Sequence, residues 1–134
     1  MKGRETLPRG VWVPAAFFAA GGILEFVLSL REAPHPLSFW PVWEALGRGL
    51  LHLLLALGLL RRVALCRQVA LIYCLVSLTM YGAVLVLAYS SAQVTVPESV
   101  VWKSLFEVPS CALLFPYFRS VEATALFSRP LFGG

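Results

Sequence analysis

The chain has 134 residues, of which 59% are hydrophobic and only 13% charged, and its net charge is +4. Soluble domains carry roughly 25% charged residues, so this composition indicates a membrane protein rather than a water-soluble fold. All acidic residues are glutamate and the chain has no asparagine, which excludes an EF-hand calcium loop and an N-glycosylation site.

The basic residues are scattered between apolar runs and form no basic face with interleaved aromatic residues, so we expect no nucleic-acid partner. Three cysteines, Cys66, Cys74 and Cys111, lack the C-x-x-C spacing of a thiol oxidoreductase or a zinc site. We expect them to be buried free thiols. No motif implies a cofactor or a metal.

Four apolar segments are expected to form transmembrane helices after a basic N-terminal tail. The first, Val11 to Leu30, spans about 30 Å at about 1.5 Å per residue, which matches a hydrocarbon core. It contains Glu25 and no small-residue cleavage site follows it, so we expect a retained helix rather than a signal peptide. The predicted spans are 11–30, 42–60, 68–89 and 99–118.

Prolines and small residues shape the first and fourth spans. Pro14 falls in the first turn of the first span, where a missing N–H costs least. Small residues from Ala15 to Gly22 allow close approach of a second helix. Pro109 and Pro116 predict a kink in the fourth span, which either shapes packing or opens a pocket.

Short connections join the spans. Arg31 to Pro41 contains three prolines and is predicted to be an outer loop, as is Ser90 to Glu98, whereas Arg61 to Arg67 is predicted to be a tight inner turn. The tail, 119–134, is expected to be cytoplasmic. Its repeated apolar residues predict that part of it lies along the membrane surface: Val121, Leu126, Phe127, Leu131 and Phe132.

The positions of the basic residues predict the orientation. The connections on the opposite side carry only Arg31, whereas the two tails and the central turn carry Lys2, Arg4, Arg9, Arg61, Arg62, Arg67, Arg119 and Arg129. By the positive-inside rule, both termini are expected to be cytoplasmic. The sequence thus predicts one all-α integral membrane domain over 1–134, a four-helix transmembrane bundle. Its short loops favour a bacterial inner membrane.

Six ionisable residues within the spans are the candidate site. Glu44, Arg48 and His52 are spaced four apart, and so are Lys103 and Glu107, so each set forms one stripe on its helix. A charge at the centre of a membrane helix costs about 2.5–3.5 kcal/mol or more, so buried charges normally pair or face water. We expect a polar cluster, for binding or proton relay, of Glu25, Glu44, Arg48, His52, Lys103 and Glu107.

Three interpretations of this cluster remain open. In the first, Glu25 pairs with Arg48 and Lys103 pairs with Glu107, and these ion pairs only fix the helix register. In the second, three carboxylates against two permanent cations leave one acid that His52 complements, which favours cation binding or a proton relay. In the third, the charges pair with another membrane protein. Tyr73 and Tyr81, inside the third span, need hydrogen-bond partners and are candidates to add hydroxyl groups to the cluster.

Three functions follow in order of preference. The first is a non-catalytic subunit or scaffold of a larger membrane complex, with the bilayer and other membrane proteins or further copies of the chain as partners. The second is a small ion- or proton-coupled transporter that uses the carboxylates. The third is a lipid-modifying enzyme with Glu44, His52 and Glu107 as acid and base. No catalytic motif supports the third, so we assign no catalytic residue.

One short segment is similar to a known family of transporters. The segment from Gly21 to Glu25 resembles the part of small multidrug resistance transporters that carries their essential glutamate, and this resemblance implies an ion-coupling role for Glu25. Those proteins are shorter and many insert with little charge bias, whereas this chain has a strong bias. We therefore do not assign the chain to that family.

Overall fold

The computed structural model describes residues 9–32, 39–90 and 96–128, and this part of the chain contains helices and no strand. The all-α prediction is confirmed for these residues. In chain order the helices are α1 (Arg9–Glu32), α2 (Phe39–Leu60), α3 (Ala64–Ser90), α4 (Glu98–Arg119) and α5 (Val121–Phe127).

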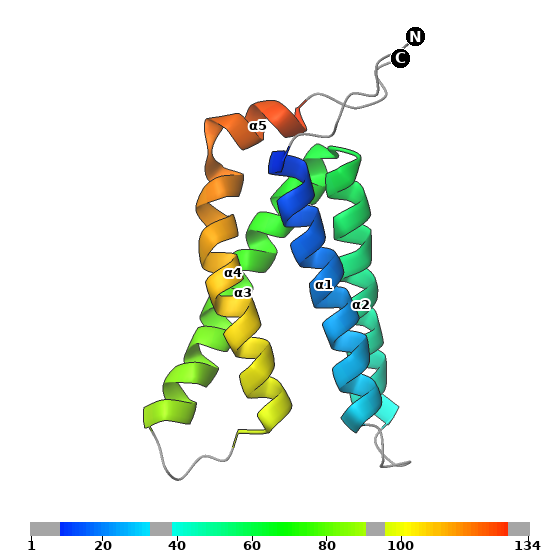
Figure 1. Cartoon of the computed structure of the whole chain (residues 1–134), viewed down its shortest axis with the longest axis vertical. Helices are drawn as coiled ribbons and strands as arrows, with labels where there is room; N and C mark the ends of the chain where they lie inside the picture. The colour runs from blue at the N-terminus through cyan, green and yellow to red at the C-terminus, as the bar shows by residue number, and fades with distance from the viewer. Residues whose placement is uncertain (1–8, 33–38, 91–95, 129–134) are drawn as a thin grey trace.

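The four long helices form two antiparallel pairs (Figure 1). Helix α1 packs mainly along α2, and α3 packs mainly along α4. The two pairs meet most closely at the end that α5 crosses, where α1 begins, α4 ends and α2 turns into α3. All five helices contribute to the apolar core there: Val11, Ala15, Phe18, Leu55, Ala56, Leu59, Ala70, Cys74, Cys111, Leu114, Phe118, Ala123 and Phe127.

The outer surface of the helices is strongly apolar. Large hydrophobic side chains are exposed along all four long helices, for example Ile23 on α1, Leu54 on α2, Ile72 on α3 and Leu113 on α4. Among the described residues, Gly10–Leu28 and Ala64–Ser90 are long and apolar enough to cross a membrane, and Leu46–Leu60 is a shorter apolar segment. α4 includes Lys103 and Glu107, and these charged residues lower its mean hydropathy.

The turn between α2 and α3 is shorter than predicted. Helix α3 begins at Ala64, so Arg67 lies in a helix and not in the predicted connection. Val63 N–H donates to Gly58 C=O at 2.9 Å and Arg62 N–H donates to Leu59 C=O at 2.9 Å, the two bonds of a Schellman motif. Arg62 has φ 56°, the left-handed conformation that this motif requires. The motif closes the turn in three residues.

Pro14 lies deeper in α1 than predicted because the helix begins at Arg9 and not at Val11. A residue at this position would donate its N–H to the carbonyl of Gly10, and proline has no N–H to donate. The Tyr117 hydroxyl of α4 donates to that carbonyl instead. A Cβ on residue 10 would lie 2.5 Å from the same hydroxyl oxygen, so glycine makes room for the contact.

We predict that Tyr117→Phe lowers the free energy of unfolding by about 1–2 kcal/mol, because the Gly10 carbonyl loses its partner in an apolar environment. The measurement is reversible unfolding in mixed micelles followed by circular dichroism. Tyr89→Phe is the matched control, since Tyr89 is 78% exposed and its loss should change stability by less than about 0.5 kcal/mol. Equal effects of the two substitutions would contradict a stabilising hydrogen bond from Tyr117 to the Gly10 carbonyl.

Helix α4 contains both Pro109 and Pro116 and is a single helix from Glu98 to Arg119. Ser120 then ends α4 and begins α5, since its hydroxyl accepts the N–H of Ala123 at 3.1 Å. Phe127 of α5 is buried against the bundle and Val121 is exposed. Leu131 and Phe132 of the predicted surface segment lie outside the described residues.

Candidate functional site

The predicted polar residues come from three helices. Glu25 lies on α1, Glu44, Arg48 and His52 lie on α2, and Lys103 and Glu107 lie on α4. The side chain of Glu44 lies outside the described part of the chain. The structure brings the other five together in two groups, one around Glu25 and one around Glu107.

The first group is an ion-pair cluster at Glu25. Lys103 Nζ contacts Glu25 Oε1 from α4, and Arg48 Nε lies 3.5 Å from the same oxygen from α2. Lys103 also lies over the ring of Tyr81, 5.2 Å from its centroid, at the distance of a cation–π interaction. Glu25 and Lys103 are buried whereas the Arg48 side chain is 43% exposed. This cluster links α1, α2 and α4 across the two helix pairs.

The second group is centred on Glu107 and lies one helical turn deeper. Its Oε1 accepts the Tyr73 hydroxyl of α3 at 2.8 Å and lies 3.6 Å from His52 Nε2 of α2. Its Oε2 lies 3.6 Å from Cys111 Sγ. His52 and Glu107 are both at most 1% exposed. Glu107 thus joins α4 to α2 and α3.

Small residues on α1 let the histidine reach this position. A Cβ on residue 21 would lie 3.0 Å from His52 Cδ2, and one on residue 22 would lie 3.2 Å from His52 Cβ. Gly21 and Gly22 therefore allow α1 to pack directly on the imidazole. The rings of Phe18 and Tyr73 complete its surroundings, with centroids 5.8 and 4.8 Å from the imidazole.

Ion pairing explains why these charges can be buried. An isolated ionised side chain pays several kcal/mol on leaving water, and a partner at contact distance offsets part of that cost. Glu25 has two cationic neighbours. Glu107 has a hydroxyl donor and an imidazole but no permanent cation in contact distance among the described ion pairs. The two carboxylates are therefore in chemically different environments.

Cys111 belongs to the second group although no chemistry was predicted for it. It lies four residues after Glu107, so extending the Lys103 and Glu107 stripe by one more turn reaches it. Tyr73 was predicted to need a hydrogen-bond partner, and that partner is Glu107. No group of three or more metal-ligating side chains is found in the described part of the chain.

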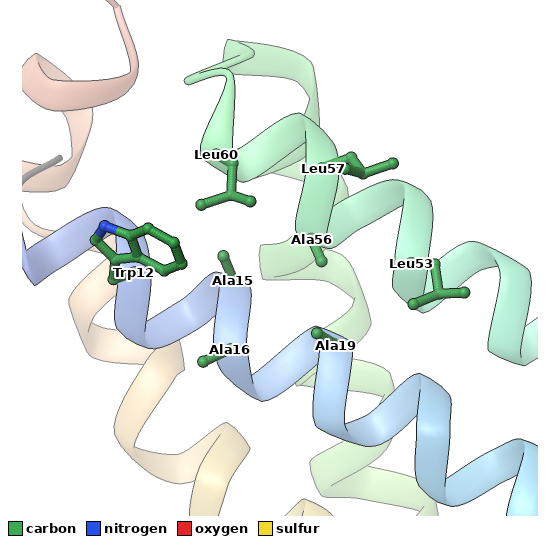
Figure 2. Close-up of a pocket in the computed structure, with 8 residues that line it drawn as sticks. All are labelled: Trp12, Ala15, Ala16, Ala19, Leu53, Ala56, Leu57 and Leu60. Atoms are coloured by element: carbon green, nitrogen blue, oxygen red, sulfur yellow. The ribbon is translucent and has the colours of Figure 1, made fainter.

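A separate apolar groove of about 310 Å³ lies between α1 and α2 (Figure 2). Alanines form its floor, and no charged side chain lines it. It therefore offers packing surface and no chemistry. Its lining residues are Trp12, Ala15, Ala16, Ala19, Leu53, Ala56, Leu57 and Leu60.

No protein family, curated protein or solved structure matches this chain. The functional argument therefore comes from the residues alone. They define an all-helical protein with an apolar exterior and a buried polar centre.

Proposed function

We propose that this chain is a four-span integral membrane protein that serves as a non-catalytic subunit or scaffold of a larger membrane complex. Charged side chains are buried and apolar side chains are exposed, which is the reverse of a water-soluble protein and supports a membrane environment. Glu25, Lys103 and Glu107 are buried in the bundle, while leucine, isoleucine and valine cover the exterior of all four long helices. In water, exposed apolar area on this scale would drive aggregation.

The ends of the bundle support an orientation with both termini cytoplasmic. Arg61 and Arg62 lie in the turn between α2 and α3, and Arg67 lies in the first turn of α3. Arg119 ends α4 at the same end of the bundle. Among the described helix ends, the opposite end carries one basic residue, Arg31, together with Glu32 and Glu98. This asymmetry follows the positive-inside rule. The short connections favour a bacterial inner membrane.

The main observation in favour of a subunit is the groove between α1 and α2. Helices associate in lipid where small residues allow close backbone approach, since lipid tails and apolar side chains are equally hydrophobic. Ala16 and Ala20 on α1 have the spacing of such small-residue interfaces and are both exposed, and Ala16 lines the groove. The occupant that this surface fits is a transmembrane helix of a partner protein.

Native mass spectrometry after mild-detergent purification from native membranes tests this proposal. We expect a stoichiometric larger partner, and we expect Ala16→Leu to reduce its recovery at least about tenfold because leucine fills the groove, a loss of about 1.4 kcal/mol in binding. Ala83→Leu, on an exposed position of α3, is the matched control. A monomer, or copies of this chain alone, would contradict the subunit proposal.

A proton- or ion-coupled carrier is the second candidate function. The observation in its favour is the buried Glu107, which contacts a histidine rather than a permanent cation. A carrier needs such a group, because it must bind and release its coupling ion within the membrane. The groove and the fully compensated Glu25 favour the subunit. A lipid-modifying enzyme has less support, because its acid and base would have to act on a substrate in a site that is closed to the surface.

A further inference from the structure

The tautomer of His52 is fixed by its own helix. His52 Nδ1 lies 2.7 Å from the backbone carbonyl oxygen of Arg48. A carbonyl oxygen only accepts, so the hydrogen is on Nδ1 and the ring donates. In the neutral imidazole, Nε2 is then an acceptor with no hydrogen of its own.

Nε2 faces a second acceptor. The nearest charged atom is Glu107 Oε1 at 3.6 Å, which already accepts the hydroxyl of Tyr73. His52 is fully buried, and its Nε2 has no hydrogen-bond partner among the described residues. Buried polar atoms without partners are rare and costly, at about 1–3 kcal/mol. One hydrogen on either atom replaces the repulsion between two acceptors by an attraction, and a hydrogen bond forms once the atoms close from 3.6 Å to about 3 Å.

The two permanent cations of the cluster lie at Glu25 and not at Glu107. Among the described side chains, Glu25 and Glu107 balance Arg48 and Lys103 in formal charge, but no described ion pair joins a permanent cation to Glu107. Lys103 and Arg48 are already used at Glu25. The ionisable groups packed around the His52 and Glu107 pair are Glu25 of α1, Arg48 of α2, Tyr73, Cys74 and Tyr81 of α3, and Lys103 and Cys111 of α4.

We propose that His52 and Glu107 form a proton-binding site that holds one exchangeable proton between His52 Nε2 and Glu107 Oε1. The proton adds an attraction between α2 and α4, and thus between the two helix pairs. This proposal deepens the carrier alternative, because it names the proton as the bound ion and places it at Glu107 rather than at Glu25. It requires neither a partner protein nor transport.

Nitrogen NMR of the full chain in lipid nanodiscs tests the proposal directly. Histidine is labelled with nitrogen-15, and His35→Gln leaves His52 as the only histidine signal. Nδ1 is expected to stay protonated at every pH, while the Nε2 signal changes with pH as one proton leaves. A proton fixed on Nε2, or an Nε2 signal that does not change with pH, would overturn the proposal.

Two substitutions should shift this titration in opposite directions. Glu107→Gln removes the anion that stabilises the imidazolium, so the proton affinity of His52 should fall at least about tenfold. Tyr73→Phe removes a hydrogen bond that stabilises the carboxylate, so the pair should bind its proton a few-fold more tightly. Glu98→Gln is the control, because Glu98 is exposed on α4, the helix of Glu107. It should change the proton affinity of the pair less than about twofold.

The outcomes separate this inference from the proposed function. An unchanged midpoint in Glu107→Gln overturns the proton site whether or not a partner is found by mass spectrometry. If Glu107→Gln fails to fold, Tyr73→Phe decides, because a fall or no change in proton affinity contradicts a proton shared with Glu107. A confirmed proton site in a chain that binds no partner would favour the carrier.

Discussion

Replacing Lys103 by methionine is expected to destabilise the bundle by about 3 kcal/mol. Breaking a buried ion pair from one side leaves the other charge uncompensated, which typically costs about 3–5 kcal/mol. The lower value applies because Arg48 still lies 3.5 Å from Glu25. The measurement is reversible unfolding in mixed micelles or bicelles, followed by circular dichroism.

The double variant with Glu25→Gln tests whether the loss comes from the pair. With both charges removed, the bundle should recover at least about 1 kcal/mol relative to Lys103→Met, since the buried Glu25 carboxylate that had lost its lysine is also gone. Arg48 is partly exposed and can extend its charge to the membrane surface. Arg31→Met, an exposed basic residue at the end of α1, controls for loss of charge alone. A double variant less stable than Lys103→Met would contradict the pairing.

The helices follow from the apolar runs of the sequence. The predicted spans 11–30, 42–60, 68–89 and 99–118 each coincide with one helix, and every helix is longer than its span. The largest extension is at the start of α3, where the chain resumes a helix right after Val63. Arg67 looked like part of a loop because arginine marks inner connections. A helix can nevertheless continue past the membrane boundary, and the Schellman motif needs only three residues.

The polar stripes were predictable, whereas the pairing between helices was not. The interpretation that paired Lys103 with Glu107 used their spacing of four. In that order, with lysine before glutamate, the pair is the less favourable orientation on a helix. Helical side chains point toward the N-terminus, so Lys103 extends away from Glu107 and reaches Glu25. The pairing of polar stripes on different helices depends on the rotation of each helix about its own axis. For α1, the contact of Gly21 and Gly22 with His52 sets this rotation.

Arg67 is expected to stabilise the fold as well as to contribute to the charge asymmetry that predicts the orientation. Its Nη1 donates to the Phe118 carbonyl at 2.8 Å and to Thr124 Oγ1 at 2.9 Å, so one side chain connects α3 to the end of α4 and to α5. Phe118 contributes one of the last carbonyls of α4, which has no partner within its helix and carries partial negative charge. The arginine satisfies it with a charge-assisted hydrogen bond, for which net contributions are about 1.5–3 kcal/mol.

Arg67→Met is therefore predicted to lower the free energy of unfolding by about 2 kcal/mol and to release α5 from the bundle. Hydrogen exchange of the amides of α5, measured by mass spectrometry in nanodiscs, should rise most near Thr124. Arg61→Met is the matched control, because Arg61 is exposed at the same turn and contributes the same charge to the orientation. If both variants lose the same stability, the positive charge at this end matters and the two hydrogen bonds do not. If only Arg67→Met loses stability, the arginine positions α5 against the bundle, and the tail is part of the fold.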